Sequence, residues 1–434
     1  MPADDARTLR GLLSRRLVRA GLMTYAFSAV TLVANLVTGI ITARALGPSG
    51  RGVAVALVTI TQLAGFFFAM GVAQSVSYFI ARRREDGPRL LTTWLLLLVP
   101  LTAMAIAISE LLLTSILAGE GEEAIAVGRW FLFTIVLVIG LELNYGLLLG
   151  VEDFVVYNAL RLAQPALTAV AFIVLWSLDA MTVESALIAA TAATGVALAV
   201  GLARAVSRIG VGRPDLGLGL HTLWYGIRGQ GVTLAANVNA RLDLAMLPAF
   251  VTAASLGLYS VATSVALIVY QLSSTFAGLL LPAAARDPDR GPQKVIGSLH
   301  ATLLTAGALA LALGLLARPL IGLVYGGEYR DAAEPLRLIL PGAVLFAGSA
   351  MVSAGLYAAG RPFTATLAQL LGTVVTIAGL VTFLDSGGIT AAALVSTAAY
   401  TTVFVATVVA YKRVTGIPWR AFVPAPSRLR ALAR

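Results

Sequence analysis

The chain has 434 residues, of which 59% are hydrophobic and 12% charged, with a formal net charge of +10 and no cysteine. A mean hydropathy of +0.89 is too high for a water-soluble core and predicts an all-α polytopic membrane protein. A sequence without cysteine excludes disulfides, thiol nucleophiles and iron–sulfur sites.

Apolar stretches of roughly twenty residues follow one another along the whole chain, and each is long enough to cross a bilayer as a helix. Helix is the expected state, because an open sheet edge would leave unpaired amides in hydrocarbon. Small residues are frequent in these stretches and allow neighbouring helices to approach closely. We predict about 12 transmembrane helices, at 22–44, 53–80, 91–117, 130–150, 154–176, 183–203, 229–250, 257–281, 295–317, 336–357, 363–384 and 390–411.

Most of the 31 Lys and Arg residues lie in the two tails and in alternate loops, which is the positive-inside pattern. The sequence therefore predicts a multi-pass protein of the bacterial plasma (inner) membrane with both termini cytoplasmic. Basic residues at membrane edges face anionic lipid head groups, so membrane lipids are the expected partners and nucleic acid is not. The predicted regions are a basic tail (1–21), an N-terminal six-helix bundle (22–203), a central cytoplasmic loop (204–228), a C-terminal six-helix bundle (229–411) and a second basic tail (412–434).

Enzymatic chemistry finds little support in the sequence. The only histidines are His221 and His300, and neither has partners at the spacing of a metal site or a catalytic triad. No G-x-x-x-x-G-K-[ST] motif is present, so the chain does not hydrolyse nucleotide through a P-loop. We predict a transporter that is not an enzyme and that has no cofactor or metal.

Related motifs recur in the two halves of the chain. Gly150 precedes Val-Glu-Asp-Phe at the end of the fourth predicted span, and Gly360 precedes Arg-Pro-Phe at the end of the tenth. Gly52 and Gly257 open the second and eighth spans. A repeat of six spans with both termini on one side is a parallel repeat, and such halves enclose a central site in transporters.

At these motifs the chain resembles the bacterial lipid-linked oligosaccharide flippases. These are polysaccharide-biosynthesis membrane proteins of the multidrug/oligosaccharidyl-lipid/polysaccharide exporter superfamily, which also holds the multidrug and toxin extruders. The motifs occur in the same order over roughly the whole chain. The resemblance is carried by residues 42–52, by 146–150 with 157–164, by 239–243 with 257–262, and by 355–362 with 387–393.

This resemblance implies two pseudo-symmetric six-helix bundles around a central cavity that opens alternately to each side. The implied substrate is a polyprenyl-pyrophosphate-linked oligosaccharide, flipped from the inner to the outer leaflet for surface polysaccharide assembly. Glycosyltransferases or a polymerase are the implied protein partners. Peptidoglycan-precursor flippases often have fourteen spans, so twelve spans make that subfamily a poorer match.

The seventh predicted span carries the strongest candidate site. A pyrophosphate in the bilayer must meet cations and water, and Arg241 lies near the middle of this span with Asp243 close by. Asn237 and Asn239 precede these two by four residues each, so the four side chains form two adjacent polar rows on a helix. We predict that they line the cavity, with Asp243 as the best site for a coupling cation. Alternatively, the charged residues only hold neighbouring helices together.

Polar residues in other spans are further candidates. Asn35 and Arg44 lie in the first span, and Gln62 and Gln271 have the side chains that bind sugar hydroxyls. Each also has a structural alternative, an interhelical hydrogen bond for the amides and snorkelling to the interface for Arg44. Arg161 either lines the cavity or joins Gln164, Glu142 and Asn144 in a buried ion pair between helices.

Two other functions remain open. A cation-coupled multidrug or metabolite antiporter of the same superfamily is expected to have acidic rather than basic cavity residues. A non-transporting membrane scaffold for glycan assembly has no need of charged residues such as Arg241 in mid-membrane.

Overall fold

The computed structural model describes the backbone of residues 3–116, 121–229, 231–285 and 291–422. Within these ranges, side chains are described except at 3–29, 115–116, 121, 123–124, 231–233, 235–237, 240 and 272–285. All regular secondary structure in these ranges is helical, which confirms the all-α prediction.

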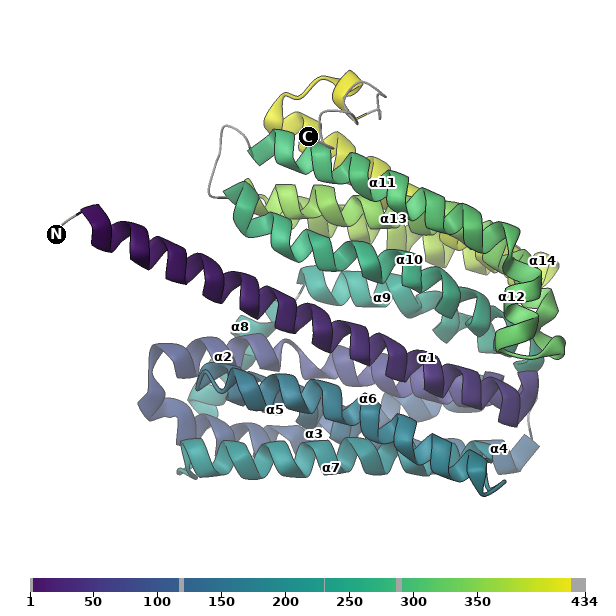
Figure 1. The fold of residues 1–434 in the computed structure, drawn as a ribbon. Helices are drawn as coiled ribbons and strands as arrows, with labels where there is room; N and C mark the ends of the chain where they lie inside the picture. The colour runs from purple at the N-terminus through teal and green to yellow at the C-terminus, as the bar shows by residue number, and fades with distance from the viewer. Residues whose placement is uncertain (1–2, 117–120, 230, 286–290, 423–434) are drawn as a thin grey trace.

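The helices form two lobes, drawn in purple to teal and in teal to yellow (Figure 1). The lobes lie closest at the end that carries α12, which we name the α12 end, and diverge toward the opposite end, which we name the α8 end. The first lobe contains α1 (Ala3–Ala69), α2 (Val72–Arg82), η1 (Arg84–Asp86), α3 (Gly87–Ile116), α4 (Gly121–Leu132), α5 (Thr134–Gly150), α6 (Phe154–Ser177) and α7 (Val183–Ile209). After α8 (Leu216–Gly229), the second lobe contains α9 (Gly231–Met246), η2 (Leu247–Ala249), α10 (Ala253–Ala285), α11 (Gly291–Leu315), α12 (Ala317–Val324), η3 (Gly327–Ala332), α13 (Ala333–Ala358), α14 (Pro362–Thr415) and η4 (Trp419–Ala421).

Glycine divides the two longest helices into pairs of spans. Gly47 in α1 has φ 64° and ψ −179°, and Gly388 in α14 has φ 52° and ψ −140°, in backbone regions that side chains disfavour. Nine helical stretches of the described residues are long and apolar enough to cross a membrane, and two of these, Val30–Arg82 and Pro362–Thr415, contain 53 and 54 residues. Dividing both at their glycines and adding the shorter α9 accounts for the twelve predicted helices.

Each lobe has its own core, and the cores adjoin at the α12 end. The first lobe buries Leu57, Trp94 and Leu147 in one cluster. The main cluster of the second lobe also includes Ala43 and Ala56 of α1. Helix α1 of the first lobe therefore contributes to the core of the second lobe where the lobes meet.

Helix α8 lies within the segment that the sequence analysis assigned to the central loop, and it packs on α2 and α3. Trp94 donates from Nε1 to Thr222 Oγ1 at 3.0 Å. A Cβ on Gly226 would lie 2.5 Å from the carbonyl oxygen of Met70, so glycine allows the backbones to touch. This segment therefore continues the packing of the first lobe before the chain enters α9.

Candidate functional site

The lobes meet at the α12 end through backbone atoms of two glycines. A Cβ on Gly52 would lie 1.8 Å from the carbonyl oxygen of Ala253, and a Cβ on Gly257 would lie 2.0 Å from that of Pro48. Both distances are far below van der Waals contact, so a side chain at either glycine would separate α1 from α10. We name these four residues the seam.

The two contacts of the seam are reciprocal. Pro48 and Ala253 are separated by 205 residues, and so are Gly52 and Gly257. Each glycine therefore faces the carbonyl group of the residue that lies four positions before the other glycine. This is the pattern of a contact across a twofold axis, and it agrees with the two pseudo-symmetric halves predicted from the sequence.

Arg51 is buried beside the seam and joins several helices. Its Nε donates to Ser260 Oγ of α10 at 2.8 Å, and its Nη1 donates to Thr42 Oγ1 at 3.2 Å and to the carbonyl oxygen of Gly39. The guanidinium also lies 5.6 Å from the ring centroid of Tyr325. Burial raises the pKa of Tyr325, an effect that the charge of Arg51 opposes, so the phenol is neutral and the contact is a cation–π interaction.

Arg44 and Tyr329 complete the closure of the α12 end. Arg44 donates from Nε to the carbonyl oxygen of Val324 at 2.9 Å and from Nη2 to that of Leu323. These are the last residues of α12, whose carbonyls lack helical partners. Tyr329 donates from Oη to the carbonyl oxygen of Ala43 at 3.2 Å. Arg44 is exposed, and the structure places it in contact between the lobes.

Arg241 and Gln62 connect the lobes farther from the α12 end. Arg241 of α9 donates from Nη1 to Gln62 Oε1 of α1. Gln62 follows Gly52 by ten residues, which on a helix is about 15 Å. Both side chains are partly buried. The structure thus brings these two predicted site residues together between the lobes.

Asp243 lies inside the second lobe. It is buried and accepts hydrogen bonds from Tyr259 Oη at 2.7 Å and from Ser396 Oγ at 3.2 Å. These partners belong to α10 and α14, so the carboxylate fastens α9 to both helices. The backbone N–H of Leu244 also donates to its Oδ1 at 2.8 Å.

Asn239 shares the inner face of α9 with Asp243, four residues away. It is buried, donates from Nδ2 to Gln369 Oε1 at 3.2 Å, and accepts from Thr376 Oγ1 at 3.4 Å. The two polar rows of this helix therefore face different ways. Asn239 and Asp243 face α14, while Arg241 faces the first lobe. The side chain of Asn237 lies outside the described residues.

Three of the remaining predicted residues have exposed side chains. Asn35 and Gln271 are exposed on α1 and α10. Arg161 is also exposed, and its hydrogen bond goes to Tyr157 Oη at 3.3 Å, within α6. Its 5.5 Å distance from the ring of Tyr157 adds a cation–π contact.

The cluster predicted around Arg161 is not an ion-paired group among the described side chains. Gln164 donates to the Oγ1 of Thr194, a residue of α7, at 3.3 Å. Asn144 is buried, and its amide has no hydrogen-bond partner among the described residues. Glu142 is partly buried in the same helix.

Arg51 was not among the predicted site residues, although the structure places it, like Arg44, in contact with the second lobe through Ser260 and Tyr325. Its neighbours in the sequence are Gly50 and Gly52, which are typical of an exposed turn. A buried charge costs several kcal/mol unless it is well hydrogen-bonded, and the position of Ser260 could not be derived from the sequence. Within the described part of the chain, no three acidic or histidine side chains gather as a metal site.

A model of the family described as "Polysaccharide biosynthesis protein" matches residues 18–286. No protein of curated function matches the sequence. Similar solved structures include "Lipid II flippase MurJ, inward closed conformation", with a TM-score of 0.76 and 14% identity over 92% of this chain and 89% of that chain. Another is the "Inward-facing conformation of a multidrug resistance MATE family transporter of the MOP superfamily", with a TM-score of 0.70 and 15% identity over 93% of this chain and 96% of that chain. At these identities the likeness shows the fold, two lobes of transmembrane helices.

Proposed function

The chain belongs to the polysaccharide biosynthesis protein family, and from that membership we propose that it flips a polyprenyl-pyrophosphate-linked oligosaccharide from the inner to the outer leaflet for surface polysaccharide assembly. The family and the fold are those of transporters rather than enzymes. Alternating access is part of the proposal, and the closed seam at the α12 end is the observation that supports it. The closed seam corresponds to an inward-facing state, in which the α8 end admits the substrate.

The position of Arg241 is the observation that supports an anionic substrate. A guanidinium that lies between the lobes and bonds to a neutral amide keeps its charge available for an anion. In surroundings of low dielectric, such a charge attracts a pyrophosphate and repels a lipophilic cation. Asp243 is only two residues from Arg241 in the sequence, but its carboxylate faces the interior of the second lobe, where it accepts hydrogen bonds from Tyr259 and Ser396. It therefore offsets the positive charge of Arg241 less than the short sequence separation suggests.

Replacement of Arg241 tests this function. We expect Arg241→Ala to slow flipping of a polyprenyl-pyrophosphate sugar in proteoliposomes about tenfold or more, since a hydrogen bond to a charged group contributes about 1.5–3 kcal/mol. Arg241→Lys should keep part of the rate, because it keeps the charge. Arg161→Ala is the matched control, as that arginine bonds within its own helix. Normal flipping by Arg241→Ala at equal insertion would contradict the proposal.

The likeness to multidrug transporters makes cation antiport the second candidate. The two candidates differ in the sign of the charge that the molecule binds. Saturable binding of ethidium that protons compete away, without a response to the lipid-linked sugar, would favour the antiporter. A non-transporting scaffold would move neither molecule. Glycosyltransferase and polymerase genes beside this gene would support the flippase and its proposed partners.

The proposed orientation places the α8 end and both termini in the cytoplasm of a bacterial inner membrane. We expect reporter fusions after Arg84 and Arg208 to be active only as cytoplasmic reporters, because Arg84 closely follows the end of α2 and Arg208 lies in the last turn of α7, both at the α8 end. A fusion after Glu328, which lies beside Gly47 at the α12 end, should report the outside. A cytoplasmic signal at Glu328 would be incompatible with this orientation.

A further inference from the structure

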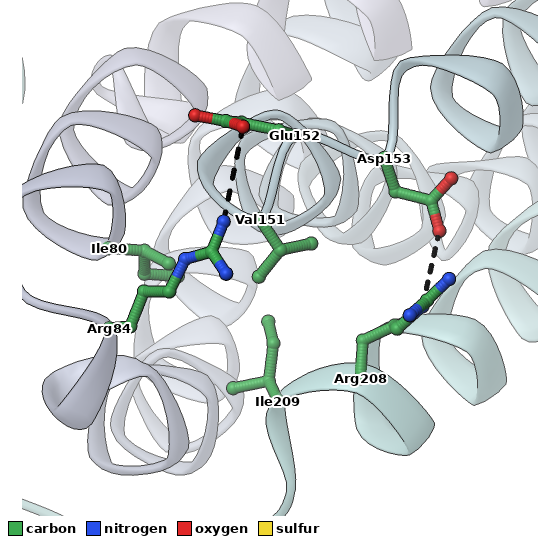
Figure 2. Close-up of a pocket in the computed structure, with 7 residues that line it drawn as sticks. All are labelled: Ile80, Arg84, Val151, Glu152, Asp153, Arg208 and Ile209. Atoms are coloured by element: carbon green, nitrogen blue, oxygen red, sulfur yellow. Dashed lines mark ion pairs between the residues drawn. The ribbon is translucent and has the colours of Figure 1, made fainter.

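A pocket of about 280 Å³ lies at the α8 end of the first lobe, where α2, α5 and α7 end and α6 begins. Arg84 and Glu152 face each other across one side, and Arg208 and Asp153 do so across the other (Figure 2). The rest of the lining is apolar and consists of Ile80, Val151 and Ile209. The proposed transport route does not use this pocket.

The charges across the pocket are paired only loosely. Arg84 Nη2 lies 4.0 Å from Glu152 Oε2, and Arg208 Nε lies 3.7 Å from Asp153 Oδ2, both longer than a hydrogen bond. Asp153 has a closer partner in Arg204, at 2.9 Å. Both arginines of the pocket and Glu152 therefore keep hydrogen-bonding capacity for a ligand.

The backbone at Glu152 is unusual. Helix α5 ends in the double hydrogen bond of a Schellman turn, from Glu152 N to the carbonyl oxygen of Leu149 and from Asp153 N to that of Leu148. The residue at this turn adopts a left-handed conformation and is commonly glycine, whereas here Glu152 has φ 61°. A non-glycine residue held in such a conformation points to a use for its side chain, and this side chain borders the pocket.

The balance of charge selects the class of ligand. Guanidinium groups match phosphate oxygens, so Arg84 and Arg208 suit a phosphate. Arg204 already pairs with Asp153, but a polyanion such as pyrophosphate would still face the carboxylate of Glu152, which disfavours it. A ligand with one phosphate and one ammonium group satisfies both signs, and a primary ammonium has three N–H donors for a carboxylate such as Glu152.

The surroundings of the pocket match those of a lipid head group. The pocket lies at the ends of membrane-spanning helices, the level at which head groups lie. Phe154 and Val155, which directly follow Asp153, are 54% and 80% exposed. They offer an apolar surface for acyl chains along the start of α6.

We infer that this pocket binds the phosphoethanolamine head group of a membrane phospholipid. The phosphate lies between Arg84 and Arg208, the ammonium group donates to Glu152, and the acyl chains pack along Phe154 and Val155. The site is distinct from the region between the lobes, so its occupancy does not depend on the transported substrate.

Binding can be measured on the full-length protein by native mass spectrometry and by thermal unfolding in nanodiscs. We expect phosphatidylethanolamine to bind roughly tenfold more tightly than phosphatidylcholine, whose trimethylammonium group has no N–H donor. Glu152→Gln should abolish that preference, so that the two lipids bind about equally. Arg84→Gln should weaken both lipids, whereas the matched control Arg83→Gln, at a neighbouring exposed residue outside the pocket, should change neither.

A series of lipids with one, two and three N-methyl groups tests the proposal on the unchanged protein, so it does not depend on the folding of any variant. Affinity that falls with each methyl group supports the assignment. Equal affinity across the series, or a preference that persists in Glu152→Gln, overturns it. Soluble glycerophosphoethanolamine should bind more weakly than the lipid, and equal binding would overturn the assignment to a membrane lipid.

Discussion

Substitution of Gly52 by valine is expected to separate the lobes at the α12 end and to slow transport about tenfold or more. The first carbon of the new side chain would lie 1.8 Å from the carbonyl oxygen of Ala253, and backbone atoms cannot move aside as a flexible side chain can. Overpacking of this kind costs about 1–3 kcal/mol, which corresponds to a shift of roughly 5- to 150-fold in the populations of the two states. Gly257→Val should have the same effect, because its clash with Pro48 is the reciprocal one.

The natural sequence has no cysteine, so the separation can be measured directly with spin labels on Ser49→Cys and Ala254→Cys, two exposed positions beside the seam. The distance should lengthen in Gly52→Val and in Gly257→Val, and the double variant should show little further change because either substitution alone separates the same two helices. Gly307→Val is the matched control, since no atom lies within 4 Å of a Cβ at that helical glycine. An unchanged distance and rate in both seam variants would refute this role for the glycines.

The second large effect is expected at Asp243. Asp243→Ala leaves the buried hydroxyl groups of Tyr259 and Ser396 without their acceptor, although these two can still bond to each other at 3.0 Å. A buried polar group left without a partner costs about 1–3 kcal/mol. We expect a clearly lower unfolding temperature in detergent and loss of transport. Asp385→Ala, on an exposed residue of α14, is the control and should change neither.

Asp243→Asn separates the structural role of this carboxylate from a role in cation coupling. The amide keeps an acceptor oxygen for Tyr259 but carries no charge. We expect the unfolding temperature to recover in this variant while transport remains low. Full transport by Asp243→Asn would restrict this residue to holding α9 against its neighbours, which was the alternative left open by the sequence.

The sequence was sufficient for the spans because long apolar stretches have one stable state in a bilayer. It also placed a break between the spans 22–44 and 53–80, a stretch that contains Gly47 and Pro48, residues typical of turns. Helix α8 was assigned to a loop, since Gly217, Gly219 and Gly226 lower the expected helical propensity. In the structure, Gly219 and Gly226 allow close packing on the first lobe, an advantage that local propensity does not include.

The sequence predicted residues of the candidate site, but it did not predict which side chains these residues contact. Arg241 and Asp243 stand out as charges in an apolar stretch. Their partners Gln62 and Ser396 lie 179 and 153 residues away, and no periodicity connects residues at such separations. Arg51 shows the converse case, because its glycine-rich neighbourhood suggested exposure and only the packing of α10 against α1 buries it.

Because the backbones of α1 and α10 touch at the seam, the seam can serve as the pivot for a rotation of one lobe against the other. Helix α10 begins at the seam and contains 33 residues, so it is a lever about 50 Å long, and a rotation of about 10° around the seam would carry its far end about 9 Å. The same rotation moves the seam atoms themselves hardly at all. In the proposed transport cycle, an entrance about as wide as a sugar ring would therefore open at the α8 end while the two glycine–carbonyl contacts stay in place.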